Sequence, residues 1–89
     1  MVKKKTCVFI SGEGTNFKKI LHRSKTEYNF PINLNILVSN NIDAKGLKLA
    51  KKFDLPSIYI KRNKKNSFIV DVILLNELKK RQINLIILA

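Results

Sequence analysis

A short polar segment near the amino terminus has the residue types needed to hold a phosphate group. It reads Ser11-Gly12-Glu13-Gly14-Thr15-Asn16 and lies between an apolar run and a helical pattern. Glycines let the backbone approach a ligand closely and adopt positive φ, and the first amides of a helix point unpaired towards an anion. Thr15 adds a hydroxyl, and Asn16 adds an amide or an N-cap. The chemistry indicates a phosphate loop, while a tight turn with an N-cap would use the same residues.

The segment departs from the sequence patterns that bind larger nucleotides. A dinucleotide fingerprint would place its third glycine at Phe17, and it would need an acidic residue after the second strand, where the chain has Asn40. The glycine-lysine pattern of the Walker loop is also absent. We therefore expect a site for a single phosphate, as in a sugar phosphate or a nucleotide monophosphate.

The elements that position this segment alternate between strand and helix. Continuous apolar runs predict buried strands, and apolar residues at helical spacing predict the helices between them. The expected strands are 6–11, 34–39, 57–60 and 85–88, and the expected helices begin near 15, 44 and 67. This β-α-β-α-β-α-β order predicts an α/β fold, with a parallel sheet covered by helices on both faces. We expect one domain over 1–89.

The third helix is expected to be the longest. Ser67 is predicted to cap it, with Lys61 to Asn66 forming a polar loop before it. The residues expected to point inward are Phe68, Val72, Leu75 and Leu78.

Composition limits the classes of partner and site. The chain has 89 residues and a net charge of +12, but 15 of its 18 basic residues are lysines, scattered without interleaved aromatics. We therefore expect solvated surface and no specific nucleic-acid site. Cys7 and His22 are single residues of their kinds, so no metal cluster is expected, and Cys7 is predicted to be a buried strand residue. No apolar run is long enough to cross a bilayer, which favours a cytoplasmic protein without a membrane partner.

Two segments in register carry a resemblance to a known family. The first is Ser11 to Asn16, and the second is Val38-Ser39-Asn40-Asn41-Ile42-Asp43-Ala44-Lys45-Gly46-Leu47, followed by Asp54-Leu55-Pro56. Together they resemble the amino-terminal part of the phosphoribosylglycinamide formyltransferases, folate-dependent enzymes of purine synthesis and one-carbon metabolism. The resemblance implies a cytoplasmic transferase with an incomplete Rossmann-like, three-layer formyltransferase fold.

The resemblance also implies which residues bind substrate. Gly14, Thr15 and Asn16 match the family residues that hold the phosphate of glycinamide ribonucleotide. For Asn40 and Asp43 we favour structural roles, with Asn40 satisfying turn amides and Asp43 capping the second helix. A family arginine near the third helix falls at Ser67 or Phe68, so Lys64 or Lys65 would have to replace it.

Catalysis is expected to need more than these residues. In the family, the site of the co-substrate 10-formyltetrahydrofolate and the catalytic asparagine, histidine and aspartate match positions mostly beyond Ala89. No catalytic residue is expected within 1–89, and the chain alone is predicted to be inactive. The expected partners are the substrate and either the carboxyl-terminal part or a dimer mate. The alternative is a non-catalytic module that binds a small phosphorylated ligand or nucleic acid.

Overall fold

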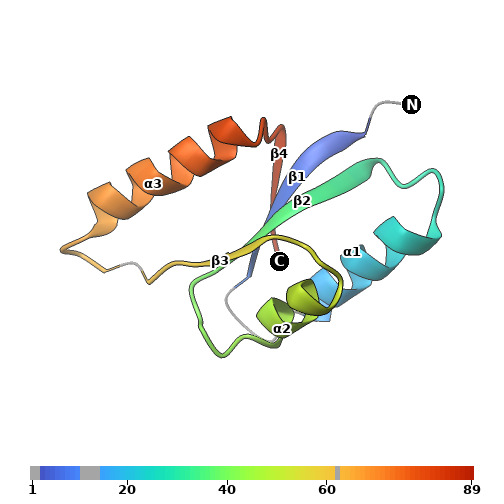
Figure 1. The fold of residues 1–89 in the computed structure, drawn as a ribbon, viewed down its shortest axis with the longest axis horizontal. Helices are drawn as coiled ribbons and strands as arrows, with labels where there is room; N and C mark the ends of the chain where they lie inside the picture. Colours follow the sequence, from blue (N-terminus) through green and yellow to red (C-terminus); the bar gives the residue numbers. More distant parts are fainter. Residues whose placement is uncertain (1–2, 11–14, 62) are drawn as a thin grey trace.

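The predicted alternation of strands and helices is confirmed. The computed structural model describes residues 3–10, 15–61 and 63–89. Within them lie one parallel sheet, ordered β3-β2-β1-β4, and three helices (Figure 1). The elements are β1 (Lys4–Ile10), α1 (Thr15–Thr26), β2 (Ile32–Ser39), α2 (Lys45–Lys52), β3 (Ser57–Tyr59), α3 (Ser67–Lys80) and β4 (Leu85–Leu88).

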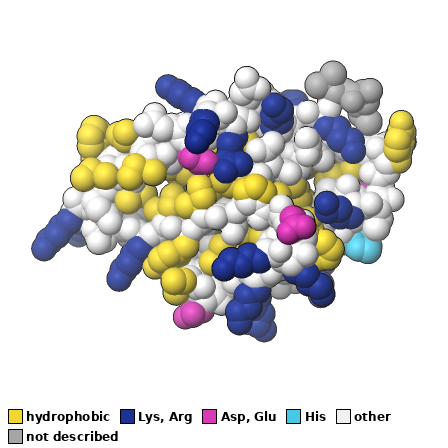
Figure 2. Space-filling model, in the orientation of Figure 1, with side chains coloured by type: hydrophobic (Ala, Val, Ile, Leu, Met, Phe, Trp, Pro, Cys, Tyr) yellow, Lys and Arg dark blue, Asp and Glu magenta, His cyan; other side chains and the backbone are white. Residues whose placement is uncertain are grey.

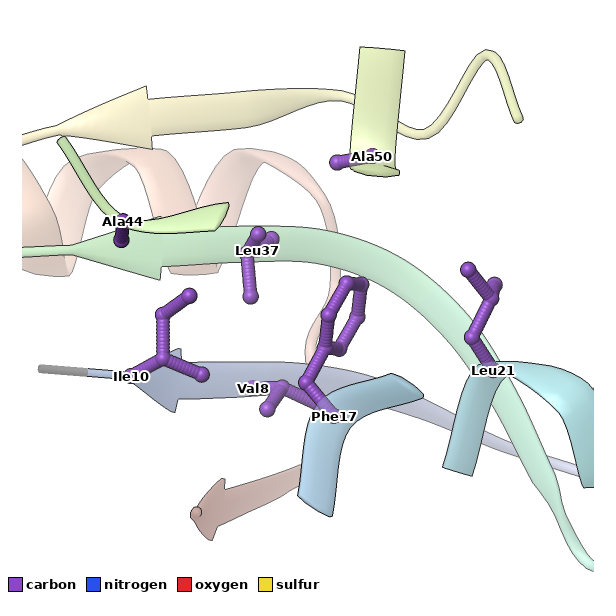
Figure 3. Packing of buried hydrophobic residues seen from close by; sticks show 7 residues of the cluster. All are labelled: Val8, Ile10, Phe17, Leu21, Leu37, Ala44 and Ala50. Atoms are coloured by element: carbon purple, nitrogen blue, oxygen red, sulfur yellow. The ribbon is translucent and has the colours of Figure 1, made fainter. Parts of the chain in front are cut away.

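The central strands β1 and β2 are apolar because helices cover both of their faces. On one face, α1 and α2 pack over a core that Figure 3 shows from close by. The Phe17 ring points from α1 towards Leu37 of β2, and neither side chain is accessible to solvent. Burial of a side chain of this size stabilises a fold by about 2 kcal/mol. The buried members of this core are Val8, Ile10, Phe17, Leu21, Leu37, Ala44 and Ala50.

On the opposite face of the sheet, α3 is the covering helix among the described residues (Figure 1). Its Leu78 is buried with Cys7 of β1 and Ile36 of β2, and Leu74 packs against the same cluster. Leu78 is the only buried residue of α3. The helix is therefore held to the sheet mainly through its carboxyl-terminal half.

The predicted inward face of α3 is wrong except for Leu78. Phe68, Val72 and Leu75 are exposed, and Leu74 takes the inward position instead. The stretch from Phe68 to Leu75 is apolar on every side of the helix except at Asp71. Periodicity therefore did not specify a face, because a helix that is apolar all round has no preferred side.

Two predicted helix caps are also wrong. The N-cap of α3 is Asn66, one residue before Ser67, and that of α2 is Ala44, without any capping bond from a side chain such as Asp43. The Asn66 side chain is turned back to the preceding loop: its Oδ1 accepts from the Asn63 amide at 2.7 Å, and its Nδ2 donates to the Lys61 carbonyl at 3.0 Å. Local bonds of asparagine compete with capping in this way.

Candidate phosphate site at the carboxyl ends of the strands

The residues predicted to bind phosphate lie where β1 gives way to α1. β1 ends at Ile10, and α1 begins at Thr15, so Gly12 and Gly14 fall outside the described residues. Thr15 and Asn16 form the first turn of α1, and both are exposed. No acidic residue lies within that turn, where an acidic side chain would offset the positive end of the helix dipole.

The buried residues on either side of the loop hold its two ends in place. Ile10 precedes the loop and Phe17 follows it, and both lie in the core beneath α2 (Figure 3). Gly46, in the first turn of α2, lies next to both of these residues. A Cβ atom at Gly46 would overlap Ile10 Cδ1 and come within 3.4 Å of Phe17 Cδ2. The absence of a side chain at Gly46 therefore lets α2 lie close to both loop ends.

Sequence reasoning did not assign this role to Gly46. The available signal was a glycine inside an otherwise amphipathic helical pattern, which costs helix stability and so points to a packing reason. Gly46 was instead treated only as part of the segment that resembles the family. The contact with Ile10 and Phe17 supplies the missing reason.

The end of β2 forms a hydrogen-bonded turn beside the loop. The buried Ser39 hydroxyl donates to the Asn41 carbonyl at 2.9 Å and accepts from the Asn41 amide at 3.0 Å. Asn41 Oδ1 in turn accepts from the Asp43 amide at 3.0 Å. The amide of Asn40 donates to the Ile10 carbonyl at 3.4 Å, which joins this turn to β1. The side chains that accept from the turn amides are therefore those of Ser39 and Asn41, and not that of Asn40 as predicted. Asp43 takes part in these bonds through its backbone amide.

A cavity of about 430 Å³ opens at the same end of the sheet, on the α3 side. Apolar side chains of β1, β2 and α3 line most of it, and Asn40 and Asp71 are its polar lining residues. Leu88 and Ala89 form the wall next to β4. Ligands of open parallel sheets bind outside the carboxyl ends of the strands, which is where this cavity lies.

The chain's two other chemically distinctive side chains lie away from the strand ends. Cys7 is fully buried in β1, as predicted, and burial raises the pKa of its thiol to about 12. His22 is exposed on α1 and lines a shallow groove with Lys18, Lys52 and Phe53, between α1 and α2. Among the described residues, no three or more His, Cys, Asp or Glu side chains are placed to hold a metal ion.

The basic residues before α3 do not lie beside the first turn of α1. Figure 1 places the start of α3 at one end of the longest axis of the molecule, far from the start of α1. Lys64 and Lys65 are exposed in that turn, where the Lys65 amide donates to Asn63 Oδ1 at 2.9 Å. The structure therefore gives no support to a contact between either lysine and the first turn of α1.

Comparison with known proteins agrees with the arrangement of strands and helices. A family model described as formyl transferase matches residues 4–89. The chain belongs to this family. The predicted resemblance is therefore confirmed at the level of the family, and an enzyme family is favoured over a free-standing binding module.

Individual relatives show which formyl transferases the chain is similar to. Phosphoribosylglycinamide formyltransferase from Haemophilus influenzae is 32% identical over 87 residues, which are 97% of this chain and 41% of that protein. The crystal structure of glycinamide ribonucleotide transformylase 1 from Geobacillus kaustophilus matches with a TM-score of 0.83 and 32% identity, over 97% of this chain and 46% of that one. This formyl transferase chain thus spans less than half the length of these relatives.

A third comparison shows the fold alone. A formyltetrahydrofolate deformylase from Pseudomonas putida matches with a TM-score of 0.86 but only 20% identity, over 98% of this chain and 30% of that one. Backbone similarity alone therefore does not identify the activity of a protein with this fold. No helix among the described residues is long and apolar enough to cross a membrane.

Proposed function

We propose that this chain is the substrate-phosphate half of a phosphoribosylglycinamide formyltransferase of de novo purine biosynthesis. Gly14, Thr15 and Asn16 bind the phosphate of glycinamide ribonucleotide. The observation that carries the proposal is the exposed first turn of α1 directly after a buried parallel strand, with Thr15 and Asn16 on it. Relatives that carry this name are 32% identical over nearly the whole chain, which supports the same assignment.

The physical basis of the proposed binding is the helix terminus together with its fixed position. The first amides of α1 have no partner within the helix and carry the positive end of its dipole. Phe17 and Gly46 hold the first turn of α1 against the core, so the Thr15 and Asn16 end of the proposed site has a fixed position. The Thr15 hydroxyl supplies one further donor.

The co-substrate of the family, 10-formyltetrahydrofolate, supplies the formyl group that is transferred. We place most of its site in the region of the relatives that has no counterpart in these 89 residues. This chain contributes the apolar wall of the cavity at Leu88 and Ala89, next to the carboxyl end of β1. Phosphate held at α1 would then place the rest of the substrate beside that cavity, since both lie at the same end of the sheet.

The 89-residue chain alone is proposed to bind substrate without transferring a formyl group. Transfer needs a positioned proton donor and a group that stabilises an oxyanion. His22 is the only histidine, and it lies in the groove between α1 and α2 rather than at the strand ends. Binding energy spent on the phosphate alone does not lower the barrier of the chemical step.

Calorimetry with inorganic phosphate and with glycinamide ribonucleotide tests the binding site. Gly14→Val should abolish binding of both, because a branched side chain blocks close approach of the backbone. A matched pair of hydroxyl deletions refines the test: Thr15→Val should weaken binding about tenfold, whereas Thr26→Val, at the other end of α1, should leave it unchanged. Equal affinity in the wild type and Gly14→Val would place the site elsewhere.

Turnover of 10-formyltetrahydrofolate with glycinamide ribonucleotide tests whether catalysis needs the carboxyl-terminal part in addition to this chain. The purified 89-residue chain should show none, and activity should arise when the carboxyl-terminal part of a relative is added. The carboxyl-terminal part alone is the control. Turnover by the 89 residues unaided would contradict the proposal, and so would phosphate binding without any activity in the combined sample.

A further inference from the structure

A shallow groove between α1 and α2 brings four basic side chains together. The two helices lie side by side over the same face of the sheet (Figure 1). We call the space between them the α1–α2 groove, and its volume is about 260 Å³. Its apolar lining residues are Leu21, Leu49 and Phe53. The basic residues that line it are Lys18, His22, Lys25 and Lys52.

The charge of the α1–α2 groove differs from that of three other hollows in the described surface. Two hollows beside Lys3 also contain lysines, but Asp54 lines one of them and Glu27 lines the other. The cavity at the carboxyl ends of the strands has Asp71 and no basic lining residue. No acidic residue is among the described residues that line the α1–α2 groove. Positive charge is therefore concentrated there without a neighbouring carboxylate, which attracts anions.

The helices themselves explain only part of this arrangement. No hydrogen bond or ion pair of the four basic side chains is found within the described part of the chain, whereas Arg23 of α1 pairs with Glu27 at 3.1 Å. Lys25 and Lys52 lie in the last turns of α1 and α2, where a positive charge complements the helix dipole. Lys18 lies near the start of α1, where the dipole disfavours a cation. An anion bound beside Lys18 would offset that unfavourable position.

The length of the groove favours an anion with more than one phosphate. Lys18 and Lys25 are seven residues apart on α1, which corresponds to about 10 Å along the helix axis. A chain of two or three phosphates matches that spread better than a single phosphate does. Phosphate oxygens form strong, charge-assisted hydrogen bonds with lysine.

Phe53 indicates which group carries the phosphates. Its side chain lines the groove at the carboxyl end of α2 and is 42% exposed. An exposed aromatic ring beside lysines is the combination on which a nucleobase stacks while its phosphates contact the cations. The groove is slightly smaller than the usual range of about 300–1,000 Å³ for small-molecule pockets, so its ligand would be partly exposed.

We propose that the α1–α2 groove binds a nucleoside diphosphate. The base packs on Phe53, and the two phosphates lie among the basic side chains of α1 and α2. Neither Thr15 nor Asn16 lines this groove, so the site is separate from the first turn of α1. The proposal does not depend on the proposed substrate.

Isothermal titration calorimetry of the purified 89-residue chain tests the site, with ADP as the ligand in magnesium-free buffer at about 50 mM salt. One ADP should bind per chain, and Lys18→Gln should weaken binding about tenfold, because a charge-assisted hydrogen bond is lost. Lys19→Gln is the matched control, since it removes the same charge from the next, exposed position of α1 outside the groove. Its affinity should equal that of the wild type. Equal losses in the two variants would overturn the proposal, because net charge alone would then explain the binding.

Pyrophosphate as a second ligand separates the aromatic contact from the charge. The wild type should bind ADP about tenfold more tightly than pyrophosphate, and Phe53→Leu should remove that difference without weakening pyrophosphate binding. Circular dichroism of each variant checks that its helix content is unchanged. A wild type without any preference for ADP would overturn the proposal, and so would equal affinity for a glutamate-rich peptide.

Gly14→Val distinguishes the groove from the proposed phosphate loop. This variant should bind ADP with unchanged affinity, although it should lose the binding of inorganic phosphate. Loss of ADP binding in Gly14→Val, with unchanged affinity in Lys18→Gln, would place the diphosphate at the loop and overturn the proposal. Absence of ADP binding to the wild type would overturn it as well, and would leave the proposed function unaffected.

Discussion

Burial decides what the single cysteine does in this protein. Cys7 pairs with Ile36 of β2 and Ile86 of β4, and its side chain is not accessible to solvent. Desolvation disfavours the thiolate and raises the pKa of the thiol to about 12. The thiol is therefore an unreactive part of the core, in keeping with a strand residue that was predicted to be buried.

Stability should consequently fall in strongly alkaline solution. The folded state holds the Cys7 proton more tightly than the unfolded chain, whose thiol has a pKa near 9.0. The contribution to stability is complete below pH 9 and is lost as the pH rises towards 12. Near pH 10.5 the loss is about 2 kcal/mol. Urea denaturation of the wild type and Cys7→Ala at matched pH measures it.

Cys7→Ala should be less stable at neutral pH because of the small cavity, but the difference from the wild type should shrink above pH 9. Lysine and tyrosine titration is common to both proteins and cancels in that difference. A difference that stays constant up to pH 11 would contradict the raised pKa.

At the candidate phosphate site, the position of the helix start was predictable from the sequence, but the packing around it was not. Thr15 and Asn16 were placed at a helix start from the glycines before them, and the structure puts both there. The role of Gly46 depends on Ile10 and Phe17, which are distant in sequence and meet only in the folded state. No local pattern contains that contact, so sequence alone could not specify it.

Among the secondary-structure elements, strands were predicted better than helix faces. The expected runs at 34–39, 57–60 and 85–88 each overlap a strand of the sheet, because continuous apolar runs bounded by turn residues are typical of buried parallel strands. The face of α3 was wrong because apolar residues surround that helix. A 3.6-residue period therefore does not specify which side of this helix faces the sheet.

The close approach of α2 to the loop ends predicts an asymmetric response at Gly46. Gly46→Ala should be near neutral, since the helix gains about 1 kcal/mol of propensity while the flexible end of Ile10 moves aside. Gly46→Leu should destabilise by about 3 kcal/mol, because the larger side chain cannot be accommodated next to Phe17. Thermal denaturation checks both values.

Lys48→Leu provides the control, because it adds the same side chain to an exposed position of α2. It should change stability by less than about 0.5 kcal/mol. Phosphate affinity should fall in Gly46→Leu even where the protein is still folded, since both loop ends shift. Unchanged phosphate affinity in that variant would show that Gly46 does not help to position the loop ends.

At the scale of the whole molecule, basic charge is spread over much of the surface. Figure 2 shows lysines and arginines distributed around the visible face and not collected in one patch. A net charge of +12 whose lysines are spread in this way gives attraction to polyanions without selectivity. The charge therefore does not identify a nucleic-acid site.

Fluorescence anisotropy with two DNA duplexes of unrelated sequence tests this interpretation. Both should bind equally and weakly, and affinity should fall on the order of 100-fold between about 50 and 200 mM salt if about four phosphates are contacted. Discrimination between the duplexes that persists at the higher salt concentration would contradict it.

The position of β4 also determines when this sheet can be completed. The Asn84 amide donates to the Lys5 carbonyl at 2.8 Å, so residues near opposite ends of the chain are hydrogen-bonded neighbours. Pairing them closes almost the whole chain into one loop, and contacts of such long sequence separation slow folding. During synthesis, β1 is made first but must wait for β4, the last of these four strands to emerge, before both of its edges are paired. Until then the growing chain exposes an unpaired edge of β1, which can pair with other chains and aggregate. We therefore expect a chaperone to be needed most during this interval.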